Sequence, residues 1–176
     1  MIVMAIIHFV MSSSSWYECW RRCGPTDAVA VLTGANGESG IVRFHQSSCD
    51  KNLVMNVTIS GLSPGLHGFH VHEKGDLTKG CDTLLAHYNP LNKTHGAPSD
   101  RNRHAGDFGN VQADQNGIVN EIISDRIASL CGDFSIIGRG IVVHKGVDDL
   151  GRGNSSLSLT TGNSGPRAAC GIIGRA

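Results

Sequence analysis

Net charge is the first property that this sequence lacks, because 15 Lys and Arg residues balance 15 Asp and Glu residues among its 176 residues. Aromatic residues are also scarce, at 5%. No cluster of basic residues is longer than Arg21-Arg22. Nucleic-acid binding usually needs a basic stripe or an aromatic stacking platform. The two absences therefore exclude nucleic acid as an expected partner.

Long hydrophobic segments are missing as well. Residues 1–11 are mostly apolar, but this stretch is too short to span a bilayer, so we expect no membrane partner. His8 interrupts the stretch, no Lys or Arg precedes it, and no small-x-small cleavage site follows it. A signal peptide and a disordered N-terminal extension are equal alternatives for residues 1–27. We expect a single domain over residues 28–176.

Zinc-ribbon CxxC spacing is absent from the six cysteines, which are Cys19, Cys23, Cys49, Cys81, Cys131 and Cys170. Their number does not decide between a cytoplasmic and a secreted protein. N-glycosylation triplets begin at Asn56, Asn92 and Asn154. Together with the apolar N-terminus, these triplets are the features that support secretion.

Glycine is abundant, at 23 residues, whereas repeats, heptads and long amphipathic helices are absent. Short apolar and β-branched runs between glycine-rich turns predict eight strands, at residues 28–33, 39–46, 53–60, 66–73, 107–113, 119–123, 140–145 and 168–174. Two long segments, residues 74–106 and 146–166, show no periodicity, which is typical of functional loops. The pattern predicts an all-β barrel or sandwich.

Histidine is the residue type that points to a function. Seven of the nine histidines fall between His67 and His144, which suggests a metal site. His70 and His72 lie on the same face of a predicted strand, so both imidazoles can reach one ion. His144 ends the apolar strand 140–145 and could complete the set. The alternative is that these histidines face water at strand ends.

The first long loop carries a second set of possible ligands. His87, His95, His104 and Asp107 lie within 21 residues and supply three nitrogens and one oxygen, which suits tetrahedral zinc. A bound metal would order a segment that has no hydrophobic pattern of its own. We therefore interpret these four residues as ligands.

Several motifs, in this order along the chain, resemble the copper/zinc superoxide dismutase family. They include Gly65-Leu-His-Gly-Phe-His-Val-His-Glu73, His87-Tyr-Asn-Pro90, Arg103-His-Ala-Gly-Asp-Phe-Gly-Asn110, Val142-Val-His144 and Ala169-Cys-Gly171. The resemblance runs from about Ala28 to the C-terminus. It implies an eight-stranded antiparallel Greek-key β-barrel with two long functional loops, of the sandwich type found also in immunoglobulin domains.

The resemblance implies two metal ions in each subunit. Copper would be bound by His70, His72, His87 and His144, and zinc by His87, His95, His104 and Asp107. His87 would be a shared imidazolate bridge and a catalytic residue. The implied activity is antioxidant: two superoxide anions and two protons give O2 and H2O2 as copper cycles between Cu(II) and Cu(I). Zinc has no redox chemistry, so its implied role is to order the loop.

Further roles come from the resemblance alone. Arg167 would attract and position the superoxide anion, although by itself it resembles an ordinary surface charge. Asp148 would link His70 to His95 from outside both metal sites. Cys81 and Cys170 would form a disulfide, whereas Cys49 and Cys131 match no cysteine of the family pattern.

The chain departs from the family pattern in the two long loops. Residues 154–161 lack the usual acidic and lysine side chains, so we expect a weaker salt dependence of the rate. Leu84 and Leu85 lie just before His87, and Leu85 occupies the place of a usual glycine. That substitution puts in doubt the local backbone and its contact with Arg167.

A third departure concerns partners. The resemblance implies a homodimer, but Lys74 and Arg175 occupy positions that are apolar at the family's dimer contact, and burying an unpaired charge is costly. A monomer or an altered interface is the alternative. A copper chaperone is an implied partner if the chain matures in the cytosol. The rival functions are a non-enzymatic copper-chaperone-like domain and a metal-binding barrel without turnover.

Overall fold

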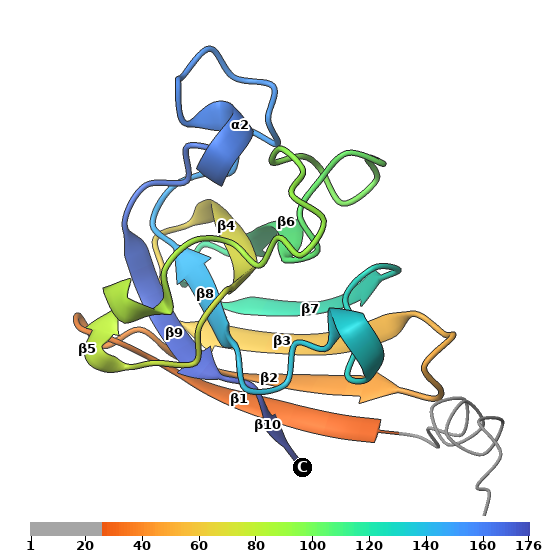
Figure 1. Ribbon diagram of the computed structural model, residues 1–176. Helices are drawn as coiled ribbons and strands as arrows, with labels where there is room; N and C mark the ends of the chain where they lie inside the picture. The colour runs from red at the N-terminus through yellow and green to blue at the C-terminus, as the bar shows by residue number, and fades with distance from the viewer. Residues whose placement is uncertain (1–25) are drawn as a thin grey trace, which may run out of the picture.

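The computed structural model describes residues 26–176 (Figure 1). Of the N-terminal segment 1–27, residues 1–25, with Cys19 and Cys23, lie outside the described residues. Thr26 and Asp27 are the first two residues of a strand, so the folded part begins two residues before the predicted start at residue 28. The main sheet consists of β1 (Thr26–Gly34), β2 (Ser39–Gln46), β3 (Leu53–Ser60), β4 (Gly65–His72), β6 (Asp107–Ala113), β7 (Val119–Asp125), β8 (Gly140–His144) and β9 (Arg167–Ile172). Two short strands, β5 (Thr78–Cys81) and β10 (Gly174–Arg175), were not predicted.

The eight long strands form a nearly closed antiparallel barrel. Their order is β6-β4-β8-β9-β1-β2-β3-β7, and β10 adds to β1. Strands β7 and β8 follow each other in the sequence but are far apart in this order, as are β3 and β4, so the chain crosses between distant parts of the sheet. All pairings between these strands are antiparallel. The predicted all-β fold with eight strands is confirmed.

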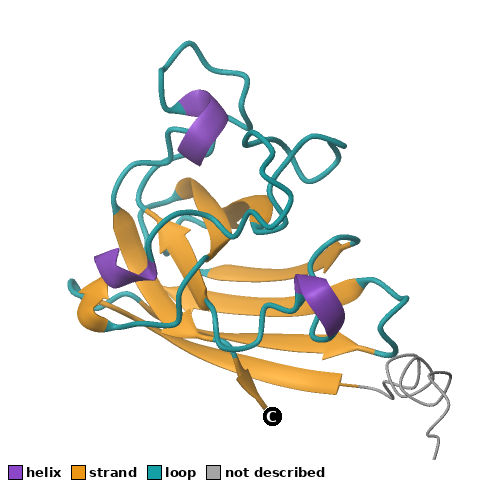
Figure 2. Cartoon of the chain, in the orientation of Figure 1, coloured by secondary structure: helices purple, strands orange, loops and turns teal. Residues whose placement is uncertain are grey.

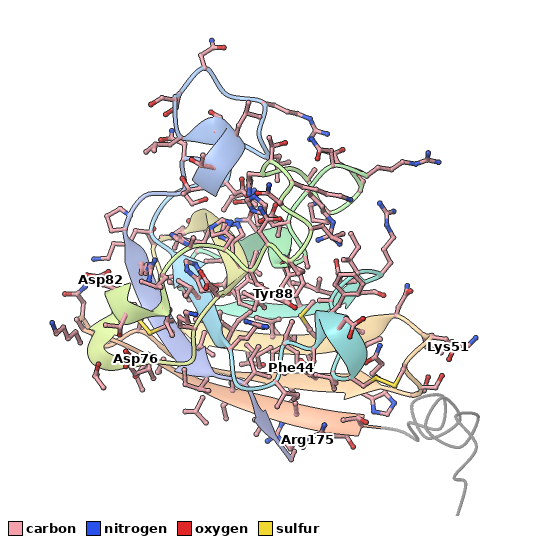
Figure 3. All side chains as sticks on the ribbon, in the orientation of Figure 1. Phe44, Lys51, Asp76, Asp82, Tyr88 and Arg175 are labelled. Atoms are coloured by element: carbon pink, nitrogen blue, oxygen red, sulfur yellow. A yellow bond between two sulfur atoms is a disulfide. The ribbon has the colours of Figure 1, made fainter. Side chains whose placement is uncertain are left out.

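Alternation of apolar and polar residues builds the barrel interior. In β3, Leu53, Met55, Val57 and Ile59 are fully buried while the residues between them are exposed. Phe44 of β2 joins the same core and is labelled in Figure 3. Burial of each large apolar side chain stabilises the fold by roughly 1.5–3 kcal/mol. The hydrophobic effect therefore explains the sheet without reference to any metal.

Strand β4 breaks this alternation because both of its faces are covered. Phe69 and Val71 point into the core, yet His70 and His72, which project from the opposite face, are buried too. Strand β8 is likewise buried along its whole length. The register pairs His70 with Val142 and His72 with Gly140, so β4 and β8 present one continuous outer surface.

Two long loops cover that surface (Figure 2). The first, residues 82–106, begins with the short helix η1 (Asp82–Leu84), and the second, residues 145–166, contains α2 (Ser158–Thr161). A third short helix, η2 (Gly132–Phe134), lies between β7 and β8. Within residues 26–176, no helix is long and apolar enough to cross a membrane.

Candidate metal centre

Four histidines from three parts of the chain converge outside the barrel wall. His70 and His72 come from β4, His144 ends β8, and His87 comes from the first long loop. One ring nitrogen from each lies within 4.8 Å of the others, and all four side chains are buried. The sequence-predicted first ligand set is therefore brought together in space.

Hydrogen bonds aim these rings toward a common point. His72 Nδ1 lies 2.7 Å from the carbonyl oxygen of Leu85, and His144 Nδ1 lies 3.0 Å from that of Gly165. A carbonyl can only accept, so in both rings Nδ1 carries the proton and Nε2 keeps its lone pair. His70 is held instead through Nε2, 2.8 Å from Asp148 Oδ2.

The remaining ring nitrogens have no partner within residues 26–176. His70 Nδ1 and the Nε2 atoms of His72, His87 and His144 are buried and make no hydrogen bond to any described residue. Buried polar atoms are normally paired, so four unpaired lone pairs at one point fit a bound cation. Burial lowers the pKa of His144 to about 4, with a further contribution from His87, and burial likewise lowers the pKa values of His70 and His72. These rings are therefore neutral at pH 7, as metal ligation requires.

The second predicted set converges on one carboxylate oxygen. Oδ1 of Asp107 lies 2.9 Å from His87 Nδ1, and 3.0 Å from Nδ1 of both His95 and His104. Although burial opposes ionisation of Asp107, hydrogen bonds from the histidines outweigh it and lower the pKa of this carboxyl. Three imidazole nitrogens and one carboxylate make a donor set that suits zinc.

His87 belongs to both sets. Its Nδ1 faces Asp107, whereas its Nε2 points toward the first set. The backbone fixes this position: His87 forms a β-bridge with His72, and Tyr88 N donates to the carbonyl oxygen of Val71 at 2.8 Å. One side chain thus joins the two groups of candidate ligands.

Asp148 belongs to neither of these two sets but connects them through one histidine of each. Its Oδ2 lies 2.8 Å from His70 Nε2, and its Oδ1 lies 2.8 Å from His95 Nε2. Burial alone would lower the pKa of His95, but hydrogen bonds to Asp107 and Asp148 raise it to about 9. Asn110 exchanges two hydrogen bonds with the Asp148 backbone. Sequence reasoning missed this contribution of Asn110, because a polar residue in a strand carries no specific signal.

Arg103 anchors the base of the first loop. Its side chain is buried, forms an ion pair with Asp125, and donates from Nη1 to the carbonyl oxygen of Asp107 at 2.7 Å. The Arg103 contacts therefore fasten the loop to the end of β7, next to Asp107.

Arg167 lies beside the first set, as the half-buried first residue of β9 paired in register with His144. Its guanidinium donates to the carbonyl oxygens of Cys81 and Leu85. The contact put in doubt by Leu85 is thus present, although Leu85 adopts φ 62° and ψ −142° to make it. This conformation is strained for a side chain other than glycine. The Leu85 carbonyl holds both His72 and Arg167, a role that the sequence does not reveal.

Two disulfides tie the described residues together. Cys81 and Cys170 are bonded, with Cα atoms 5.8 Å apart, and join the start of the first loop to β9. Cys49 and Cys131, for which the sequence offered no partners, form a second bond.

The fold and the paired ligand sets define a class: a β-barrel with two adjacent candidate metal sites that share one histidine. The family model for copper/zinc superoxide dismutase matches residues 38–173, and the chain belongs to this family. A superoxide dismutase [Cu-Zn] of Saccharomyces cerevisiae is 50% identical over 148 residues, which cover 84% of this chain and 96% of the relative.

Two further relatives support the same assignment. A superoxide dismutase [Cu-Zn] of Candida glabrata is 49% identical over 148 residues, 84% of this chain and 96% of the relative. An extracellular superoxide dismutase [Cu-Zn] of Onchocerca volvulus is 49% identical over 154 residues, 86% of this chain and 77% of the relative.

Proposed function

We propose that the protein is a superoxide dismutase that converts two superoxide anions and two protons to O2 and H2O2. Family membership and the names of all three relatives support this activity. The observation that carries the proposal is the junction at His87. Each of its ring nitrogens faces a separate group of buried donor atoms.

The chemistry of each donor set supports a different metal. We assign copper to the all-histidine set of His70, His72, His87 and His144, because imidazole nitrogens suit copper. We assign zinc to His87, His95, His104 and Asp107, because a carboxylate with three imidazoles is a common zinc set. When bound, copper supplies one-electron redox chemistry, whereas zinc supplies fixed positive charge and order.

The protein's own groups attract the anion and handle protons. Arg167 is half-buried beside His144, so its positive charge can attract and orient superoxide at the first set. Asp107 faces Nδ1 of His87, which leaves Nε2 as the atom that can carry a proton to the product. Asp148 keeps His70 and His95 in fixed ring orientations.

We propose a homodimer, with an interface that keeps Lys74 and Arg175 hydrated. Both side chains are exposed in the single chain, and Lys74 already pairs with Glu73 at 2.9 Å. Sedimentation equilibrium of the metal-loaded protein would test this assembly. A monomeric mass would contradict it.

We propose that residues 28–176 form the enzyme domain and that secretion is the compartment to test first. The triplets at Asn56, Asn92 and Asn154 begin on exposed residues, and one relative is named extracellular. If the protein instead matures in the cytoplasm, a copper chaperone would be its partner.

The activity is tested with the full chain loaded with copper and zinc. Superoxide dismutation and metal content should be measured for the parent, His144→Ala and His45→Ala. His45 is an exposed histidine of β2 that belongs to neither set, so it is the matched control. We expect activity that follows copper content, is lost in His144→Ala and persists in His45→Ala. A fully metallated parent without activity would instead support a metal-binding barrel without turnover.

A further inference from the structure

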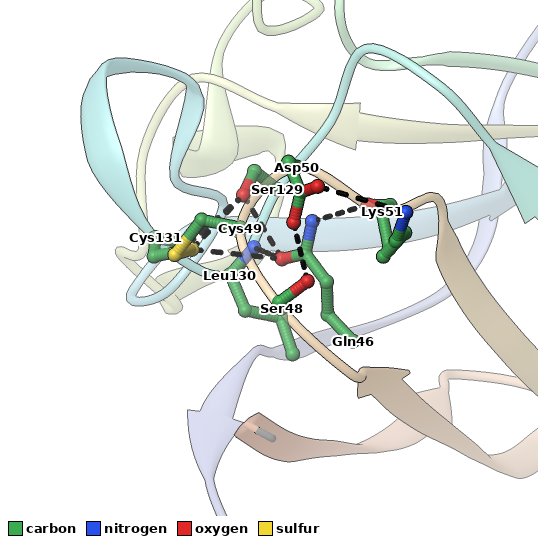
Figure 4. Close-up of a disulfide and its surroundings, with 8 residues drawn as sticks. All are labelled: Gln46, Ser48, Cys49, Asp50, Lys51, Ser129, Leu130 and Cys131. Carbon is green, nitrogen blue, oxygen red and sulfur yellow. Dashed lines mark hydrogen bonds and ion pairs between the residues drawn. A yellow bond between two sulfur atoms is a disulfide. The ribbon is translucent and has the colours of Figure 1, made fainter. Parts of the chain in front are cut away.

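The second disulfide lies outside the two ligand sets, although the hydroxyl of Tyr88, the residue after His87, donates to the carbonyl oxygen of Asp133 near Cys131 at 3.0 Å. Cys49 is in the loop between β2 and β3, and Cys131 immediately precedes η2. Their Cα atoms are 6.0 Å apart, and the bond closes a separation of 82 residues (Figure 4). None of the candidate metal ligands is among the residues around this bond.

Hydrogen bonds hold the same two loops together independently of the disulfide. The buried Gln46 accepts through Oε1 from Ser129 Oγ at 2.9 Å and from Leu130 N at 2.8 Å. Its Nε2 donates to the carbonyl oxygen of Lys51 at 2.8 Å. Because Gln46 already fixes the loops, opening the disulfide would leave the folded arrangement in place. The bond then acts mainly by restricting the unfolded chain.

The two disulfides differ in their exposure to reductants. Cys49 and Cys131 are both half-buried and line an open surface cavity of about 420 Å³. In contrast, Cys170 is only 3% exposed and packs in a small apolar cluster with Leu84 and Val142. Thiol–disulfide exchange needs access of a thiolate to a sulfur atom. The Cys81–Cys170 bond also lines a surface cavity, of about 460 Å³, but there only Cys81 is half-buried and Cys170 is not exposed. The Cys49–Cys131 bond therefore offers two partly exposed cysteines, and the Cys81–Cys170 bond offers one.

The charged side chains around the Cys49–Cys131 bond are balanced in sign, so they repel neither anionic nor neutral thiols. Asp50 and Asp133 line the cavity together with Lys51 and Arg126, so two acidic side chains face two basic ones. An anionic thiol such as glutathione and a neutral one such as dithiothreitol can therefore both approach.

We propose that Cys49–Cys131 is a redox-labile disulfide that small thiols reduce while Cys81–Cys170 stays oxidised. A thiolate attacks one sulfur to form a mixed disulfide, and a second thiol releases it. The sum is two cysteine thiols plus one oxidised small disulfide, a transfer of two electrons. The reverse reaction, with a small-molecule disulfide as oxidant, forms the Cys49–Cys131 bond again. Opening it lowers stability without disturbing the metal centre, so the proposal does not depend on the proposed activity.

The order of reduction is the direct test. The metal-loaded full chain is equilibrated with a series of glutathione concentrations, free thiols are alkylated, and the labelled peptides are identified by mass spectrometry. We expect half-labelling of Cys49 and Cys131 at a concentration at least about tenfold lower than for Cys81 and Cys170. Simultaneous labelling of all four, or earlier labelling of Cys81 and Cys170, would overturn the proposal.

A pair of variants tests the effect on stability. Cys49→Ser/Cys131→Ser should lower the thermal midpoint on the order of 10 °C, with copper and zinc content unchanged. Cys19→Ser/Cys23→Ser carries the same number and kind of changes and serves as the control. A midpoint equal to that of the control would contradict a stabilising role of this disulfide. Loss of metal from the Cys49→Ser/Cys131→Ser variant would contradict its independence from the metal centre. If that variant fails to fold, the labelling experiment on the parent still decides the question.

Discussion

The sheet formed by β1, β2, β3 and β7 and the loop region of residues 82–106 and 145–166 are organised by different forces. The sheet pairs strand to strand in continuous register, with apolar side chains on its inner face. The loops lack such strand pairing, and some of their backbone groups bond to side chains that also position the candidate ligands. Gly96 N donates to Asp107 Oδ2, and Asp148 N donates to Asn110 Oδ1.

This difference separates stability from metal affinity. Apolar burial alone stabilises the sheet, so substitutions in its core should lower the free energy of unfolding. The loop region supplies His87, whose Nε2 has no partner among residues 26–176, and His95 and His104 of the second ligand set, so substitutions there should weaken metal binding first. The predictions below test that separation.

The largest effect is expected in the sheet. Phe44→Ala removes a side chain that is 1% exposed and should lower the free energy of unfolding by about 3–5 kcal/mol. Urea denaturation measures this change. Ile122→Ala, on a residue of β7 that is 76% exposed, is the control and should change stability by less than about 0.5 kcal/mol. Equal losses in the two variants would mean that the core does not dominate stability.

A smaller but more specific effect is expected behind the metal sites. Asp148→Asn removes the carboxylate charge between His70 and His95 and should weaken zinc binding by about 10–100-fold. Competition with a chelator measures the affinity. The neighbouring variant Asp149→Asn changes a carboxylate that accepts from Gly151 N and Ser158 Oγ and from no histidine of residues 26–176, and we expect much less effect. Matched losses would show that Asp148 has no special role.

The smallest predicted effect is a gain in stability. Leu85→Gly removes the cost of φ 62° in a leucine, at the expense of added freedom in the unfolded chain, and should stabilise the protein by about 1 kcal/mol. Thermal unfolding measures it. Leu84→Gly deletes a fully buried side chain next door and should destabilise instead. A loss of stability in Leu85→Gly would mean that its side chain contributes more than the backbone strain costs.

The sequence predicted the sheet well because its physical signal is local. Alternation in residues 53–60, with glycine turns on either side, was enough to place β3. The family resemblance, and not the residue spacing, assigned the candidate ligands to two sites that share His87. Spacing alone could not show which lone pairs meet in space.

Other features depend on contacts that no local pattern encodes. The carbonyl oxygens of Leu85 and Gly165 orient two histidines, and any residue type could supply them. The partner of Cys49 is 82 residues away, and only the β2–β3 loop geometry brings it close. The short strand β5 lies in a segment without periodicity, where hydrophobic patterning has nothing to detect.

Hydrogen exchange of the metal-free and metal-loaded protein tests the central claim most directly. We predict that metal removal raises exchange by at least roughly tenfold in residues 82–106 and 145–166, while the amides of β1, β2, β3 and β7 change little. That result would show that bound metal orders the loops over an independently stable sheet. A uniform change across the chain, or none in the two loops, would contradict it.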